Sequence, residues 1–160
     1  MKKAASLVST LLLAATFGLP AASHPAAAEA RCHKVHAHIT DTVTTEGCDS
    51  PVGLCTSGVV TGDGLLHGTI DVTVLGFAPG ATPDTLSVDA IDTFHTAHGD
   101  VTFHVSGHWD PVTGVFTFVD QQPAGTGRFE GATGRLYDNG AVIAEGTFDS
   151  DVSGEICLAR

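Results

Sequence analysis

Apolar and polar residues alternate with a period of two in several short stretches of the chain, which is the pattern of half-buried β-strands. In residues 69–74, Ile70, Val72 and Val74 share one face and polar residues occupy the other. The same alternation recurs, with varying contrast, in residues 100–106, 115–119 and 142–148. After the N-terminal region no stretch of about ten residues carries helical spacing with capping residues. The pattern predicts an all-β protein without a substantial helix.

Turn-forming residues separate these stretches. They occur at Asp63-Gly64, Pro79-Gly80, His98-Gly99-Asp100, Asp110-Pro111 with Gly114, and Asp138-Asn139-Gly140. Asp138-Asn139-Gly140 is a strong hairpin signal, because Asn and Gly readily adopt the positive φ that tight turns need. Their spacing predicts about eight short antiparallel strands in a sandwich or a closed barrel.

The first 30 residues have the features of a secretory signal peptide. Met1-Lys2-Lys3 is followed by an apolar run from Leu7 to Leu19, and Ala28-Glu29-Ala30 offers a cleavage site. Ala21-Ala22-Ser23 is an earlier alternative site, and a membrane anchor is the alternative interpretation of the run, which is shorter than about 20 apolar residues. We expect a secreted or periplasmic protein whose single domain is 31–160, with no further membrane span.

Acidic residues outnumber basic residues. The chain has 18 Asp and Glu against 7 Lys and Arg, a formal charge of -11. Cleavage after Ala30 would leave 5 basic and 17 acidic groups, a charge of -12. Nucleic acids and anionic membrane surfaces are bound through clustered Lys and Arg, so this balance argues against both partners.

Four cysteines follow the expected signal peptide, and an even count in an exported chain predicts disulfides. Cys48 and Cys55 bracket a turn-rich segment and are expected to pair, which leaves Cys32 with Cys157. The second bond would join the start of the mature chain to its end. It favours a closed barrel, since adjacent first and last strands leave no free sheet edge. Four thiolates around zinc are the alternative, although the spacing of Cys32 and Cys157 does not suit it.

A glycine-rich segment, Gly125-Thr126-Gly127-Arg128-Phe129-Glu130-Gly131-Ala132-Thr133-Gly134-Arg135-Leu136, resembles a hairpin of secreted bacterial allene oxide cyclase-like proteins, which are distantly related to plant dirigent proteins. The stretches Ser50 to Thr56, Gly68-Thr69 and Gly154 to Cys157 are similar to the same family in the same order. The resemblance implies an eight-stranded antiparallel barrel with an apolar interior, and a homo-oligomer by analogy with plant members. It implies no particular reaction, because fold alone does not fix function.

Two carboxylates interrupt otherwise apolar strand faces. Asp41 follows Val35, Ala37 and Ile39 at alternate positions, and Asp92 interrupts the face of residues 86–94 in the same way. A buried carboxylate with a raised pKa is suited to acid/base chemistry, so Asp41 and Asp92 are the candidate catalytic residues. Two alternatives place them in water: Asp41 at the barrel mouth, and Asp92 turned outward by a β-bulge near Ile91.

Eight histidines remain after the expected cleavage. His36 and His38 project from one face of an extended segment, as two metal ligands on a strand must. His104 is the candidate third ligand, with His95, His98 and His108 as alternatives. Because the apolar face alternates with them, His36 and His38 are expected outside the barrel. Such a patch can bind Zn or Cu weakly, or serve only as a neutral surface that becomes cationic near pH 6.

Three functions are compatible with these residues. The first is binding of a small apolar ligand inside the barrel, with Phe103 in the lining and Trp109 at the mouth, although Trp109 can equally cover the end of the core. The second is a cyclase- or isomerase-like enzyme that uses the barrel as a template. The third is a non-catalytic extracellular domain, structural or metal-binding. No other cofactor is indicated, and the sequence does not decide whether the protein is an enzyme.

Overall fold

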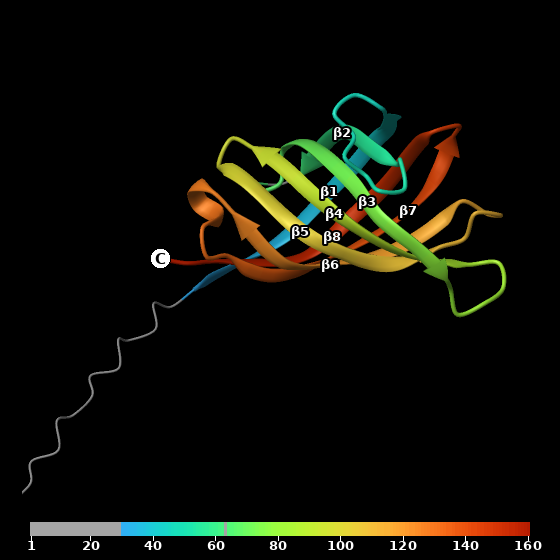
Figure 1. The fold of residues 1–160 in the computed structure, drawn as a ribbon. Coiled ribbons are helices and arrows are strands. Elements are labelled where there is room, and N and C mark those ends of the chain that lie inside the picture. Colours follow the sequence, from blue (N-terminus) through green and yellow to red (C-terminus); the bar gives the residue numbers. More distant parts are fainter. Residues whose placement is uncertain (1–29, 63) are drawn as a thin grey trace, which may run out of the picture.

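The structure is a computed structural model that describes residues 30–62 and 64–160. The described residues form eight antiparallel strands in a closed barrel, in which each strand pairs with its neighbours in chain order (Figure 1). The strands are β1 (Arg31–Thr44), β2 (Cys55–Gly62), β3 (Gly68–Pro79), β4 (Leu86–Thr96), β5 (Gly99–Trp109), β6 (Val115–Gly125), β7 (Thr133–Ala144) and β8 (Thr147–Leu158). A short 3₁₀ helix, η1 (Gly127–Phe129), connects β6 to β7. The expected all-β closed barrel is confirmed.

Pairing of β1 with β8 closes the sheet. Their register runs from Arg31 opposite Leu158 to Thr42 opposite Thr147, and it places Cys32 opposite Cys157. These two cysteines form a disulfide across a sequence separation of 125 residues. The second disulfide joins Cys48 to Cys55. Both predicted pairings are confirmed, and they leave no free cysteine among the described residues. Zinc coordination by four thiolates is therefore wrong.

One end of the barrel is solidly packed. Phe129 of η1 is fully buried there, and Leu66 from the connection between β2 and β3 lies in the same apolar cluster. The rings of Phe94 and Phe103 meet edge to face, with centroids 5.8 Å apart. Gly131 supports the turn into β7 with a φ of 68°, a conformation that glycine adopts without strain. The glycine-rich segment is thus a plug for this end.

The predicted hairpin at Asp138-Asn139-Gly140 is wrong. These residues lie within β7, and the chain reverses instead at Glu145-Gly146, inside the stretch expected to be one strand over 142–148. Gly146 supplies the positive φ of 67°. Gly140 serves close packing: a Cβ there would lie 2.5 Å from Cζ of Phe116, on the neighbouring strand. Asp138-Asn139-Gly140 therefore belongs to strand β7, where the lack of a side chain at Gly140 leaves space for the ring of Phe116.

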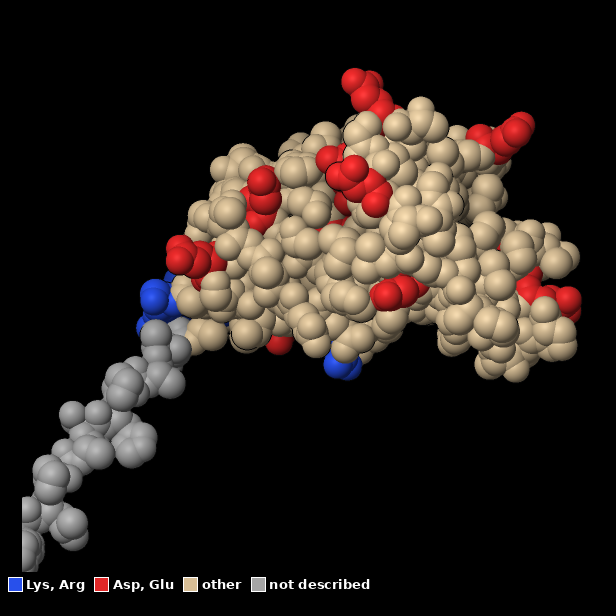
Figure 2. Space-filling view, in the orientation of Figure 1, with Lys and Arg blue, Asp and Glu red and all other residues tan. Residues whose placement is uncertain are grey.

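Charged side chains on the outer surface are mostly acidic. Figure 2 shows Asp and Glu scattered over the visible face, with Lys and Arg at one end and at one point below. Arg31, Arg128 and Arg160 line a single shallow depression. No helix among residues 30–62 and 64–160 has the length and hydropathy needed to cross a membrane. The expected signal peptide, 1–30, falls almost wholly outside the described residues and stays a prediction, as does secretion.

Removing the Cys32–Cys157 disulfide should destabilise the barrel more than removing Cys48–Cys55. In the chain-entropy account the cost depends on loop length, and the separations of 125 and 7 residues correspond to about 5 and about 2.5 kcal/mol. Urea denaturation of the double variants Cys32→Ser/Cys157→Ser and Cys48→Ser/Cys55→Ser measures the difference. Equal losses would contradict the assignment of Cys32–Cys157 as the main restraint on the unfolded chain.

Candidate functional site: a cavity with a carboxyl floor

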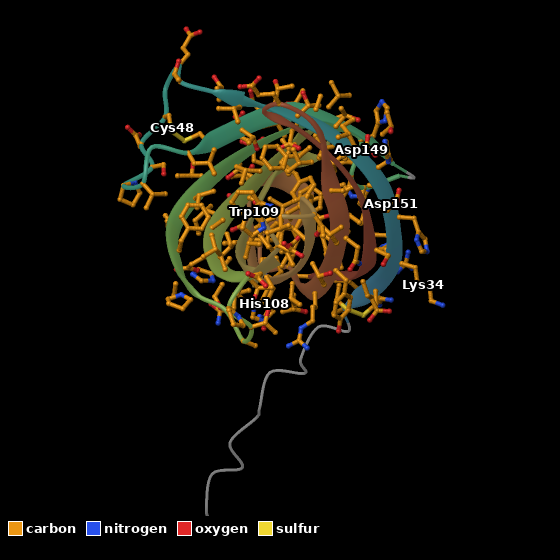
Figure 3. All side chains as sticks on the ribbon, turned by 90° about the vertical axis from the view of Figure 1, so that its right-hand side faces the viewer. Lys34, Cys48, His108, Trp109, Asp149 and Asp151 are labelled. Carbon is orange, nitrogen blue, oxygen red and sulfur yellow. A yellow bond between two sulfur atoms is a disulfide. The ribbon has the colours of Figure 1, made fainter. Side chains whose placement is uncertain are left out.

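A cavity occupies the end of the barrel opposite the plug. Eighteen residues from all eight strands and the loop before β2 line it, and its volume is about 80 Å³. Figure 3 looks into this end and shows Trp109 within the ring of strands, while Lys34 and Asp151 lie on the outside. The aromatic part of the wall consists of Phe77, Trp109, Phe116, Phe118 and Phe148. This cavity is the candidate functional site.

The loop before β2 is held against the cavity mouth. The Cys48–Cys55 disulfide closes this loop at its base. The hydroxyl of Ser50 donates to the carbonyl of Val74 at 2.5 Å and accepts from the backbone N–H of Leu54 at 3.1 Å. The N–H of Val74 in turn donates to the carbonyl of Leu54 at 3.1 Å. These bonds place the Leu54 side chain in the cavity wall.

Four aspartates on different strands have their side chains buried inside the barrel. Their exposed fractions are 8% for Asp41, 5% for Asp92, 0% for Asp120 and 7% for Asp138. Asp41, Asp92 and Asp138 line the cavity and form its floor, whereas Asp120 is not part of the lining. They come from β1, β4, β6 and β7, so the floor exists only in the closed barrel.

Few hydrogen bonds satisfy these carboxyl groups. The Thr56 hydroxyl donates to Oδ2 of Asp41, and Ser150 hydrogen-bonds Asp138. Oδ1 of Asp138 and both carboxyl oxygens of Asp120 are buried without a partner. Gly58 faces Asp41 across the β1–β2 pair, and a Cβ at Gly58 would lie 2.4 Å from Cβ of Asp41. A side chain at position 58 would therefore displace the Asp41 carboxyl.

Burial raises the pKa of all four carboxyl groups, because it penalises the charged form. For Asp41 the hydrogen bond from Thr56 partly opposes the rise. Burial raises the pKa of Asp92 well above its ordinary value, and the charges of Asp120, Asp138 and Asp41 raise it further. The pKa of Asp120 is raised well above its ordinary value by burial and by Asp138. Burial raises the pKa of Asp138 to about 7, against the hydrogen bond from Ser150.

Both carboxylates singled out in the sequence lie in the cavity. The alternative that a bulge turns Asp92 outward is wrong: the register of β4 with β5 is continuous through Ile91, and the irregularity of β4 with β3 falls on β3 between Val74 and Gly76. The alternative that Asp41 lies in open water is wrong as well, since only 8% of it is exposed. Their catalytic role stays a prediction.

Asp120 and Asp138 were missed as interior carboxyls. Asp120 continues the alternate positions of Phe116 and Phe118, and Asp138 follows Leu136 two residues later. This alternation is the feature of the sequence that indicates an inward position for both aspartates. It was obscured for Asp138 because the residue was assigned to a turn, and for Asp120 because Val115, whose side chain is 52% exposed, lies on the opposite face from Phe116.

The two aromatic residues predicted to bind a ligand lie in different parts of the barrel. Trp109 lines the cavity, and its indole Nε1 is buried without a partner. Phe103 is fully buried in the packed end and does not line the cavity. The alternation of β5 correctly placed Phe103 inside the barrel. It did not distinguish the packed end from the hollow one, because this depends on what the loops at each end contribute.

The candidate metal-binding histidines are not brought together. His36 and His38 lie on the outside of β1, as expected, and His104 lies on β5, with three strands between β1 and β5 in either direction. Nε2 and Nδ1 of His38 lie 3.2 Å from carboxylate oxygens of Asp149 and Asp151, respectively. The hydrogen bond with Asp151 raises the pKa of His38. Zn or Cu binding at these histidines stays a prediction.

Among residues 30–62 and 64–160, one group brings three candidate metal-ligand atoms within 4.8 Å of one another. It consists of Cys32, Glu155 and Cys157. Both cysteines are consumed by their disulfide, so this group lacks the thiolates that a metal would need.

Searches against protein-family models, curated proteins and solved structures find no match to this chain. The resemblance to allene oxide cyclase-like proteins therefore stays a prediction, and so does a homo-oligomer.

The protein should become less stable as pH rises from about 4 to about 7. An aspartate with a folded pKa of about 7 and an ordinary value of 3.8 binds more protons in the native state than in the unfolded state between these values. Asp138 alone should lower the free energy of unfolding by about 2 to 3 kcal/mol between pH 5 and pH 8. The raised pKa values of Asp41, Asp92 and Asp120 act in the same direction.

Asp138→Asn should reduce this pH dependence and raise the urea midpoint at pH 8, because the amide has nearly the same shape and does not ionise. Asp84→Asn, at an exposed position in the turn after β3, is the matched control and should retain the full dependence. Urea denaturation at both pH values measures the effect. Identical pH dependence in the wild type and Asp138→Asn would show that Asp138 does not titrate as described.

Proposed function

We propose that this protein binds a small, largely apolar molecule in the barrel cavity, and that it does so outside the cytoplasm. The observation that carries the proposal is the contrast between the two ends of one barrel. Large side chains fill one end, whereas the other is hollow and walled by five aromatic rings. Ligand sites are typically concave, mostly apolar and provided with a few polar groups, and β-barrel mouths are a common place for them.

The hollow end argues against a purely structural role. A barrel selected only for durability gains from filling its interior, since missing packing contacts cost stability. The buried carboxyls at the floor add a further cost that packing alone does not offset. Two disulfides restrain the fold and are consistent with an oxidising compartment.

Acid/base catalysis is a second candidate function, favoured by Asp138. A carboxyl with a pKa of about 7 in a cavity wall can both donate and accept a proton near neutral pH. A cyclase- or isomerase-like reaction, in which the barrel imposes the geometry and a carboxyl moves the proton, fits these features. The family suggested by the glycine-rich segment is compatible with this function, and we retain that relationship as a proposal.

The single tryptophan allows ligand binding to be measured directly. Trp109 lines the cavity and is the one Trp in the sequence, so its fluorescence should change saturably on titration with neutral 2-phenylethanol, with a dissociation constant below about 1 mM. Ala90→Leu fills the cavity from the β4 wall and should weaken binding about tenfold or more. Ala81→Leu, at an exposed turn position, should leave it unchanged. Absence of a saturable change with this probe and with its positively and negatively charged analogues, or equal binding to Ala90→Leu, would refute binding in the cavity.

Native mass spectrometry of protein purified from a secreting host, followed by NMR identification of the released molecule, separates binding from catalysis. A binding protein should retain the same small molecule in the wild type and in Asp138→Asn. An enzyme that needs Asp138 should retain different molecules in the two, since the variant would hold substrate where the wild type holds product. The substrate and product of a cyclase or isomerase have the same mass, so the molecules released from both proteins are compared by NMR. Identical retained structures would exclude a catalytic role of Asp138 in converting that molecule.

A further inference from the structure

The polarity of the cavity is one-sided. Every buried charged side chain among the described residues is an aspartate. Three of these aspartates form the floor, and the lining contains no Lys, Arg or His. Apart from Thr56 and Ser150, the rest of the lining is aliphatic and aromatic. A ligand that fits this arrangement has an apolar body and a head group that complements several carboxyls.

We propose that the ligand of this barrel is an organic cation, with an aromatic or aliphatic body in the cavity and a protonated amine that donates to Asp138 and is attracted by Asp41 and Asp92. The inference rests on the proposed binding function and specifies the chemical class of the ligand. Three features of the cavity carry it: unpartnered carboxyl oxygens, aromatic walls, and a separation of the carboxyls that does not suit a metal ion.

Unpartnered oxygens at the floor call for a donor. Asp138 is 7% exposed and lines the cavity, and its Oδ1 has no hydrogen-bond partner. Asp120 lies outside the lining, but both of its carboxyl oxygens lack a partner, and its charge raises the pKa of Asp92. A primary ammonium offers three donors and a positive charge, so it satisfies carboxyl oxygens and relieves the repulsion between them.

An anionic ligand does not fit the same floor. A carboxylate or phosphate head would be repelled by three aspartates, and the lining has no basic side chain to offset this repulsion. A neutral alcohol would bind one carboxyl and leave the repulsion between the others unchanged. Charge complementarity therefore distinguishes a cation from the other apolar ligands of similar size.

A bare metal ion does not fit either. A metal site needs several ligand atoms converging on one point. Among residues 30–62 and 64–160, no three of the four interior carboxyls bring oxygens within 4.8 Å of one another. An ammonium that donates to Asp138 does not require this convergence, because Asp41 and Asp92 attract it through their charge without a direct contact.

The walls suit the remainder of such a ligand. Phe116 and Phe118 stack with ring centroids 4.9 Å apart, and Phe148 lies 6.2 Å from Phe116. Trp109 lies 6.1 Å from Phe77 nearer the mouth. Aromatic faces attract cations electrostatically and bury apolar bodies, and both effects are strongest where water is excluded.

Three probes of matched shape test the inference: 2-phenylethylamine, 2-phenylethanol and 3-phenylpropanoate, which carry a positive, a neutral and a negative head at neutral pH. Isothermal titration calorimetry and Trp109 fluorescence should both give the order amine, alcohol, carboxylate, with the amine at least about tenfold tighter than the alcohol. The full mature protein with both disulfides is used throughout.

Isosteric variants locate the interaction. Asp138→Asn should weaken binding of 2-phenylethylamine about tenfold and change binding of 2-phenylethanol less than about twofold. Asp84→Asn removes one exposed charge and should affect neither, which controls for the overall charge of the protein. Asp41→Asn provides a second test at the floor, and circular dichroism of each variant confirms that the barrel is folded.

Each outcome decides a different statement. Binding of the alcohol as tightly as the amine, or equal loss of amine affinity in Asp138→Asn and Asp84→Asn, overturns the cation proposal and leaves the apolar binding function in place. Tighter binding of 3-phenylpropanoate overturns it as well. Failure of all three probes to bind in the wild type refutes the binding function itself.

Discussion

The β1–β8 pairing is the contact on which the rest of the structure depends, because it turns a sheet into a container. Only a closed sheet gives each strand an inside and an outside that persist around the molecule. The Cys32–Cys157 disulfide lies within this pairing. It therefore holds together the two strands that close the barrel. Without the β1–β8 pairing, the four aspartates would not share an interior.

The interior divides into two parts with opposite physical properties. At one end the loops contribute Leu65, Leu66 and Phe129, which pack between the strands and exclude water. At the other, Leu54 and Trp109 line the cavity without filling it. Asp41, Asp92 and Asp138 line the hollow part. Burial raises the pKa of these carboxyls, so ionising them costs free energy in the folded protein.

Much of the fold could be predicted from the sequence, because strand alternation and disulfide pairing are local or countable properties. Asp41 and Asp92 were recognised because each interrupts a clear run of apolar partners on its own strand. Asp120 and Asp138 were not recognised. On β6 the exposed Val115 obscures the alternation, and on β7 the triplet Asp138-Asn139-Gly140 is typical of a turn. The histidines on β1 and β5 showed the reverse error: residues plausible as partners proved to lie on distant strands.

The sequence by itself determined which residues face inward on the clearest strands, which cysteines pair, and that the protein is all-β. These properties follow from period-two alternation and from the chemistry of an even set of cysteines. Only the tertiary structure decided where the interior is hollow and which carboxyls meet there. Those features depend on barrel closure and on loop packing at each end, which join residues from strands far apart in the chain and leave no periodic trace in it.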